Sequence, residues 1–213
     1  LCVLLVLQVL SGLLLAFHYT CDVNVSYYSV IHIVRDVYYG WCFRYLHSVG
    51  ASLVLGAMYF HMIRGIYVVC YQYNSNLWLS GVVLFLLIMA ISFLGYVLTW
   101  GHMSFWGGTV ISNLLCCIPC CVYVMLGGLY VCNASLRRFF VFHVAISICV
   151  LLFVVVHICY VHYVSSSNPM CIVYNNVCHL FPSVICKDVF VLFIFIVLVL
   201  VMLAFLGVYS LCH

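Results

Sequence analysis

The sequence has very little charge. Of its 213 residues, six are Lys or Arg, three are Asp or Glu, and 69% are apolar. An ordinary soluble domain has about a quarter charged residues. This composition therefore excludes a water-soluble globule and predicts a chain surrounded by lipid. The formal net charge is only +3, and there is no run of basic residues. The sequence therefore gives no basis for nucleic-acid binding.

The sequence does not begin with the features of a natural amino terminus. Leu1 already lies in an apolar run, with no initiator Met, basic segment or cleavage site before it. We therefore expect the natural amino terminus to lie upstream.

The sequence also lacks a paired cysteine motif. Its 15 Cys are scattered through apolar runs, where Cys packs as a small hydrophobic residue. One cluster, Cys116 to Cys121, contains a CxxC, but a metal or redox site needs partner ligands that the sequence does not supply. We expect these cysteines to have a packing role.

Long apolar runs are abundant, and a run of about 20 such residues can cross a bilayer as a helix. We expect membrane spans at residues 1–19, 41–70, 77–98, 136–164 and 189–211, the first of them truncated. A polar, aromatic stretch (20–40) follows the first span, and Gly, Trp and Pro interrupt residues 99–133, where we expect short interfacial helices. The sequence predicts an all-α, polytopic transmembrane bundle. Residues 1–164 would form a four-helix unit, and residues 165–213 a loop and a fifth span.

Four histidines share one spacing within two of these spans. His47 and His61 are 14 residues apart on the second span, and His143 and His157 are 14 apart on the fourth. In a helix, 14 residues return to within about 40° of the same face after a rise of about 21 Å. Because the second and fourth spans run parallel, His47 lies level with His143, and His61 lies level with His157. The spacing thus predicts two bis-histidine sites, the ligand set of a low-spin haem.

Glycines and arginines accompany the histidines. A haem between helices needs space and cations for its propionates. Gly81 and Gly95 on the third span are also 14 residues apart, and Gly12 on the first span provides space for one site. The expected propionate partners, each within five residues of a ligand histidine, are Arg44, Arg138 and Arg64.

Two other classes of function also use intramembrane histidines. A dihaem anchor of a dehydrogenase has similar ligand pairs. A transporter or channel uses histidine for metal or proton sites, and a lone intramembrane histidine is often only a hydrogen-bonded helix contact. The repeated spacing, with flanking Arg and Gly, favours two haems.

Motifs along essentially the whole sequence resemble mitochondrial cytochrome b, the membrane redox subunit of ubiquinol–cytochrome c reductase (bc1) complexes. The motifs are SGLLLAFHYT (11–20), HIVRDVYYGW (32–41), RYLHSVGAS (44–52), FHMIRG (60–65), GYVLTWGHMSFWGGTVISNLL (95–115), RRFFVFH (137–143), SSNP (166–169) and KD (187–188). The resemblance implies that the spacing-derived pairs have distinct roles. His47 and His143 would hold the low-potential b-type haem, and His61 and His157 the high-potential one.

The resemblance also implies two quinone sites. One wall of a quinol-oxidation pocket would be formed by Phe93, Tyr96, Gly107 and Gly108, within a loop at about 100–133. The quinone-reduction pocket would contain His162, Lys187 and Asp188. The substrates would be ubiquinol and ubiquinone. The chain would cross the mitochondrial inner membrane several times in a dimeric complex with cytochrome c1 and the Rieske iron–sulfur protein.

The sequence departs from the family in three places. Thr99-Trp100-Gly101-His102 replaces the family's Pro-Trp-Gly-Gln, and Tyr163 replaces the Glu that usually follows the pocket histidine. The family's later Pro-Glu-Trp-Tyr motif and last three spans are absent. We expect a fragment of the respiratory type. The alternative is a split chain like the cytochrome b6 of photosynthetic complexes, where the fourth-span histidines are typically one residue further apart.

Overall fold

The computed structural model describes residues 1–114, 117–164 and 179–211, and these form helices joined by short connections. Its elements are α1 (Cys2–Ala16), α2 (Ser26–Arg35), α3 (Gly40–Tyr67), α4 (Cys70–Tyr73), α5 (Ser75–Val97), α6 (His102–Leu114), α7 (Pro119–Leu126), α8 (Asn133–Val164), a π-helical turn η2 (Leu180–Val184) and α9 (Ile185–Leu211). The SSNP motif, Cys116 and most of the loop expected before the fifth span lie outside the described residues.

The long helices agree with the expected transmembrane bundle. Four are long and apolar enough to cross a membrane: Gly40–Tyr67, Ser75–Val97, Asn133–Tyr163 and Leu180–Met202. The fifth, α1, is apolar and has 15 residues, as the truncated first span predicts. In lipid, a helix satisfies its own backbone hydrogen bonds, so hydropathy alone is sufficient to identify these elements.

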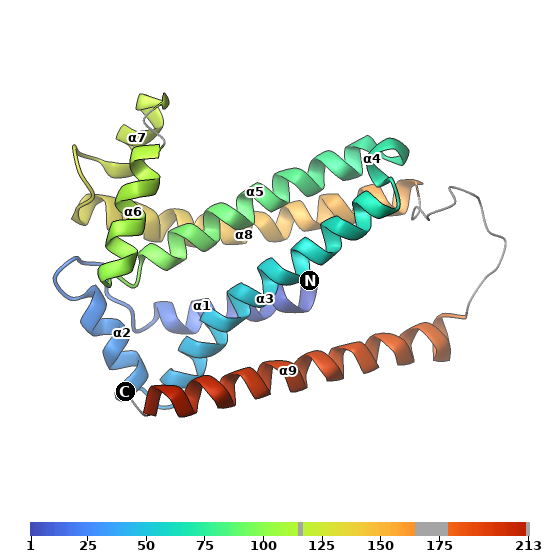
Figure 1. Cartoon of the computed structure of the whole chain (residues 1–213), viewed down its shortest axis with the longest axis horizontal. Helices are drawn as coiled ribbons and strands as arrows, with labels where there is room; N and C mark the ends of the chain where they lie inside the picture. The colour runs from blue at the N-terminus through green and yellow to red at the C-terminus, as the bar shows by residue number, and fades with distance from the viewer. Residues whose placement is uncertain (115–116, 165–178, 212–213) are drawn as a thin grey trace.

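Four helices form one elongated bundle. Helix α5 packs along α8, α1 packs along α3, and α9 packs against the outside of α3 (Figure 1). The short helices α6 and α7 project from one end of the bundle (Figure 1). They lie within the segment expected to contain interfacial helices.

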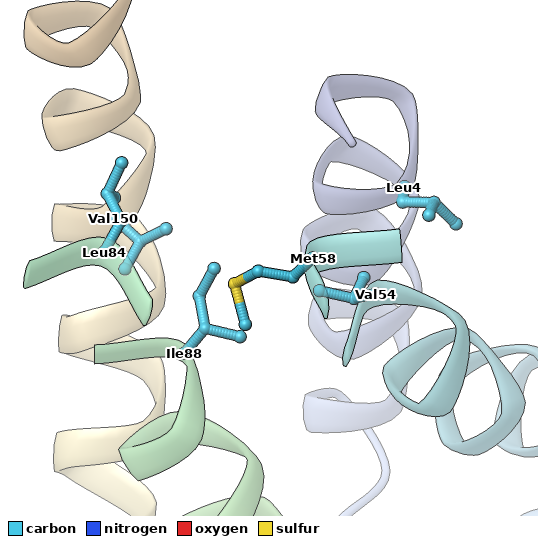
Figure 2. Close-up of a cluster of buried hydrophobic side chains, with 6 residues drawn as sticks. All are labelled: Leu4, Val54, Met58, Leu84, Ile88 and Val150. Carbon is cyan, nitrogen blue, oxygen red and sulfur yellow. The ribbon is translucent and has the colours of Figure 1, made fainter. Parts of the chain in front are cut away.

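A cluster of buried apolar side chains lies inside the bundle and joins α1, α3, α5 and α8 (Figure 2). Its members are Leu4, Val54, Met58, Leu84, Ile88 and Val150. Val54 and Val150 are each seven residues from both histidines of their helix, and Ile88 is seven residues from both Gly81 and Gly95. The cluster is therefore an apolar layer midway between the two histidine levels.

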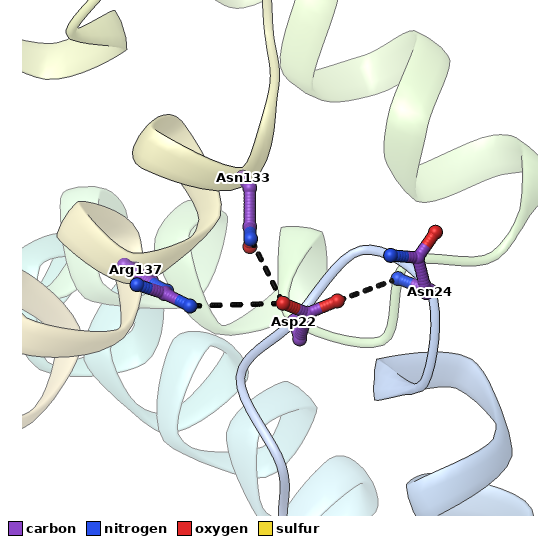
Figure 3. Close-up of polar contacts among 4 residues, drawn as sticks. All are labelled: Asp22, Asn24, Asn133 and Arg137. Atoms are coloured by element: carbon purple, nitrogen blue, oxygen red, sulfur yellow. Dashed lines mark hydrogen bonds and ion pairs between the residues drawn. The ribbon is translucent and has the colours of Figure 1, made fainter.

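Polar clamps hold α8 at both of its ends. At one end, Asp22 Oδ2 accepts a hydrogen bond from Asn133 Nδ2 at 2.8 Å and lies 3.6 Å from Arg137 Nη2 (Figure 3). At the other end, Asn74 Nδ2 donates to the Tyr160 carbonyl at 3.2 Å. The side-chain oxygen of Asn74 also caps α5 by accepting from the backbone N–H of Leu77. Each clamp connects a loop to α8 without placing a charge inside the bundle.

Helix α2 is an element that the sequence analysis did not predict. It lies in the stretch expected to be only polar and aromatic, and it buries Ser26, Ser29 and Ile33. Ser29 accepts a hydrogen bond from the backbone N–H of Thr20 at 3.3 Å, so this face of α2 packs on the preceding connection. At Gly40, a Cβ would lie 1.9 Å from the Ile33 carbonyl oxygen, so the contact requires glycine.

Candidate functional site

The structure brings the four spaced histidines together as two pairs. The ring centres of His47 and His143 are 6.3 Å apart, with ring planes at 76°. The ring centres of His61 and His157 are also 6.3 Å apart, with planes at 62°. Each pair joins α3 to α8, as expected for residues at the same level on parallel helices. The two sites therefore have the same separation of imidazoles.

This separation fits two imidazoles on opposite sides of one metal ion. An imidazole nitrogen lies about 1.2 Å from its ring centre and about 2.0 Å from a bound transition metal. Two axial imidazoles on one iron thus place their ring centres about 6.4 Å apart. Among the described residues, no group of three or more His, Cys, Asp or Glu could hold a metal ion. The pairs therefore fit a group that supplies its own equatorial ligands, as a porphyrin does.

Hydrogen bonds set the protonation of the first pair. His143 Nδ1 lies 2.9 Å from the Ile91 carbonyl oxygen, which can only accept. His47 Nδ1 lies 3.0 Å from Ser11 Oγ, and that hydroxyl donates to the Leu7 carbonyl at 2.7 Å. In both rings Nδ1 therefore carries the proton. Nε2 is left with its lone pair, the form that binds a metal.

In the second pair, one histidine, His157, has a similar hydrogen bond. His157 Nδ1 lies 2.8 Å from Ser80 Oγ, which donates to the Leu77 carbonyl at 2.8 Å. His157 is therefore held with Nδ1 protonated. His61 is more exposed than its partner and makes no side-chain hydrogen bond with the residues that the structure describes. Three of the four rings thus have a partner that orients them for binding through Nε2.

The spaced glycines lie directly against these rings. A Cβ on Gly95 would be 2.6 Å from His143 Cε1, one on Gly12 would be 2.9 Å from His47 Cε1, and one on Gly81 would be 3.2 Å from His157 Cε1. Separations under about 3.0 Å require a shift of neighbouring atoms, because real side chains rarely approach so closely. The three glycines thus leave room for the imidazoles at both levels.

The three arginines have different surroundings. Arg44 is half-buried one turn before His47, and Arg64 is exposed in the last turn of α3. Neither forms an ion pair with any residue in the described part of the chain. Arg138 instead donates to carbonyls at the end of α7, those of Tyr123 at 3.3 Å and Val124 at 2.9 Å. In this arrangement Arg138 stabilises the end of α7, a role that its spacing from His143 did not indicate.

The residues expected at the first quinone site gather where α5 ends and α6 passes it. A Cβ on Gly107 would lie 3.8 Å from Tyr96 Cε1, and one on Gly108 would lie 3.2 Å from Val97 Cγ1. Tyr96 is 52% exposed. Phe93 packs edge-on against Phe139 of α8, with ring centres 6.2 Å apart. Tyr96 is thus the exposed member of this group, Phe93 and Gly107 are half-buried, and Gly108 is buried.

The residues expected at the second quinone site share one end of the molecule. His162 lies in the last turn of α8, and Lys187 and Asp188 lie in the first turn of α9. All three side chains are exposed. No hydrogen bond or ion pair joins any two of them within the described residues. The structure places them at the same end but not in contact.

The sequence analysis missed the two serines that orient histidine rings. Ser11 and Ser80 each directly precede a spaced glycine, Gly12 and Gly81. This repeated Ser-Gly pair was the available signal. Glycine makes room for the ring, and the preceding serine lies close enough to accept from its Nδ1–H.

Comparisons with known proteins identify the family and the fold of this chain. The profile of the family described as cytochrome b/b6/petB matches residues 1–165. A protein named cytochrome b from Toxoplasma gondii is 49% identical over 164 residues, which are 77% of this chain and 45% of that protein. A solved chain titled "Hyperthermophilic respiratory Complex III" has the same fold, with a TM-score of 0.87 at 24% identity. The match covers 94% of this chain and 57% of the solved one. The chain therefore spans about half the length of these relatives.

Proposed function

This chain belongs to the cytochrome b family, and we propose that it is the dihaem electron-transfer subunit of a respiratory quinol–cytochrome c reductase. The observation that carries the proposal is the equal 6.3 Å separation within both histidine pairs. Two equivalent sites stacked across a membrane suit transfer of electrons from one face to the other. The Toxoplasma relative, named cytochrome b, favours the respiratory type over a split b6-type chain.

Family membership implies haem binding, and two b-type haems are proposed here. His47 and His143 would hold the low-potential haem, and His61 and His157 the high-potential haem. The bound haems would supply one-electron carriers about 21 Å apart along α3. Ser11, Ile91 and Ser80 keep three of the imidazoles in the orientation and tautomer that ligation needs. The half-buried Arg44 and the exposed Arg64 are the cations available for propionates.

Quinol oxidation is assigned to the surface formed by the end of α5 and α6. Gly107 has no side chain to cover the adjacent Tyr96 ring, so a flat quinol ring could approach the backbone there. Phe93, one turn before Tyr96 on α5, and the buried Gly108 would support this wall. This surface adjoins the level of His47 and His143. An electron leaving the quinol there would have a shorter path to the His47–His143 pair than to the His61–His157 pair.

Quinone reduction is assigned to the opposite end of the bundle, near the level of His61 and His157. A quinone that accepts two electrons also takes up two protons. His162 and Asp188 could deliver them to the two carbonyl oxygens, and Lys187 could attract the reduced ring's negative charge. The three side chains are exposed at this end, so they have access to water for reprotonation.

The proposal extends to the assembly and its location, for which membership of the family is the support. The proposed partners are cytochrome c1 and the Rieske iron–sulfur protein within a dimeric complex, and the proposed membrane is the mitochondrial inner membrane. The four long apolar helices make the chain a membrane protein. Residues 1–164 are the proposed dihaem unit, and residues 165–213 contribute the loop and α9.

A reduced-minus-oxidised optical spectrum of the purified complex tests the function. We expect two b-type α-bands and two haems per chain. A protein without b-type bands that retained bound Zn²⁺ or moved protons would instead be the metal or proton transporter that intramembrane histidines also allow.

A further inference from the structure

The connection between α1 and α2 contacts the turn that joins α5 to α6, a contact that none of the proposed roles uses. The hydroxyl of Tyr19 donates to the Leu98 carbonyl at 2.7 Å, across 79 residues of sequence. Near the same turn, a Cβ on Gly101 would lie 3.9 Å from Tyr27 Cε2. The α5–α6 turn is therefore bonded to Tyr19 of this connection and lies close to Tyr27, in the first turn of α2.

Tyr19 is itself held firmly. Its ring stacks on Phe140 of α8, with ring centres 5.7 Å apart and planes at 30°. A tyrosine hydroxyl is protonated at neutral pH, so it can donate to the carbonyl that it meets. A rigid ring with this donor is suited to fixing the position of that carbonyl.

The Leu98 carbonyl is at a position where the backbone changes direction. Leu98 is the C-terminal cap of α5, where carbonyls have no partner further along the helix. Two residues later Trp100 has a φ of 49°, a left-handed conformation uncommon outside glycine. Helix α6 then begins at His102. The hydrogen bond from Tyr19 thus fixes the last carbonyl before the turn that sets the direction of α6.

The direction of α6 in turn determines the surface assigned to quinol oxidation. It places Gly107 beside the Tyr96 ring and Gly108 against Val97. We propose that Tyr19 is a positioning residue for quinol oxidation. By bonding to the Leu98 carbonyl, it fixes how α6 packs on α5 and thus keeps Gly107 beside the exposed Tyr96 ring. This inference rests on the proposed function, and Tyr19 itself need not touch quinol.

Steady-state kinetics of the complex carrying Tyr19→Phe test the inference, because phenylalanine keeps the stacked ring and removes only the hydroxyl. With a short-chain ubiquinol as substrate, we expect KM to rise about three- to tenfold with kcat nearly unchanged, as for a loss of substrate binding. Both b-type bands and the rate of quinone reduction at the other end should stay at wild-type values. The matched control is Tyr28→Phe, the same change at an exposed tyrosine on α2.

A wild-type KM in Tyr19→Phe would overturn the inference while leaving the proposed function intact. Absence of quinol oxidation by the unmodified complex would instead overturn the proposed function. If Tyr19→Phe fails to assemble, Phe140→Leu decides the question, since it keeps the hydroxyl but removes the ring that steadies it. A raised KM in Phe140→Leu supports the positioning role, and an unchanged KM rejects it.

Discussion

Single glycines at the histidine levels are not equivalent, because they approach the rings at different distances. A Cβ on Gly95 would meet three atoms of the His143 ring at 2.6, 3.1 and 3.2 Å, whereas one on Gly81 would be no closer than 3.2 Å to His157. The backbone of α5 at Gly95 cannot move aside as readily as the His143 side chain, so the ring would have to move. One added methyl group should therefore displace His143 more than His157.

We therefore expect Gly95→Ala to lose most of the haem at the His47–His143 level, while Gly81→Ala retains most of the other. Overpacking of this kind costs about 1–3 kcal/mol even in an ordinary core. Haem per chain and the two b-type bands measure the outcome. Gly56→Ala is the control, because a Cβ there meets nothing within 4 Å. Equal haem content in Gly95→Ala and Gly56→Ala would contradict the assignment.

Ser80, beside His157, should affect the reduction potential of the haem at that level and not its binding. Ser80 Oγ accepts from His157 Nδ1–H at 2.8 Å, which makes the imidazole a stronger electron donor to iron. In Ser80→Ala we expect both haems to bind. The reduction potential of one should rise by about 40 mV, the equivalent of one hydrogen bond of about 1 kcal/mol.

Potentiometric titration of the two b-type bands measures this shift. Ser92→Ala is the matched control on the same helix, because Ser92 Oγ donates only to the Ile88 carbonyl. A shift of similar size in both variants would show that the effect is not transmitted through His157.

At the scale of elements, the Asp22 clamp connects the α1–α2 loop to the beginning of α8. The backbone N–H of Asn24, the side chain of Asn133 and the charge of Arg137 hold the pKa of Asp22 below its ordinary value. A lowered folded-state pKa means that the carboxylate stabilises the fold at pH values above the unfolded pKa of about 3.9. The contribution disappears as pH falls through the folded-state pKa.

We therefore expect Asp22→Asn to lower the melting temperature of the chain in detergent at pH 7. The difference from the unmodified chain should shrink as the pH falls and vanish at a second pH below the folded-state pKa, where Asp22 is protonated as well. Thermal unfolding at the two pH values measures this. Asp36→Asn provides the control, since the side-chain contact of Asp36 is with His32 on its own helix. A difference that persists unchanged at the lower pH would exclude the charge as its cause.

The elements divide by how strongly the sequence encodes them. The long helices could be predicted because lipid demands apolar runs, and the histidine levels followed from a 14-residue spacing on parallel helices. Helix α2 was missed because its buried face contains small serines, which do not stand out among polar residues. The α7 contacts of Arg138 were missed for another reason: they join residues that only the tertiary fold brings together.

At the scale of the whole molecule, the two proposed quinone sites lie at opposite ends of the bundle. His162, Lys187 and Asp188 lie where α8 ends and α9 begins, whereas α2, α6 and α7 lie at the other end (Figure 1). A change in proton supply at one end should therefore leave chemistry at the other end unaffected. The three acidic residues of the chain, Asp22, Asp36 and Asp188, allow the same substitution to be compared at both ends.

We expect Asp188→Asn to leave both haem spectra intact and to slow reoxidation of the His61–His157 haem by quinone about a hundredfold or more, the usual scale for loss of a proton donor. Flash kinetics measure this rate when quinol oxidation is inhibited after the haem has been reduced. Asp36→Asn, at the opposite end, should reoxidise at the unmodified rate. Unmodified rates in both Asp188→Asn and His162→Leu would place quinone reduction elsewhere.

The apolar layer between the histidine levels has a consequence for energy conservation. An electron can tunnel through closely packed aliphatic groups, whereas a proton moves only along groups that form hydrogen bonds. The six buried side chains of the layer, from Leu4 to Val150 (Figure 2), contain no such group. In the proposed subunit, an electron could therefore cross this layer while the layer itself offers a proton no path. Each electron that crosses the layer without a proton would then separate charge and contribute to the electrical potential across the membrane.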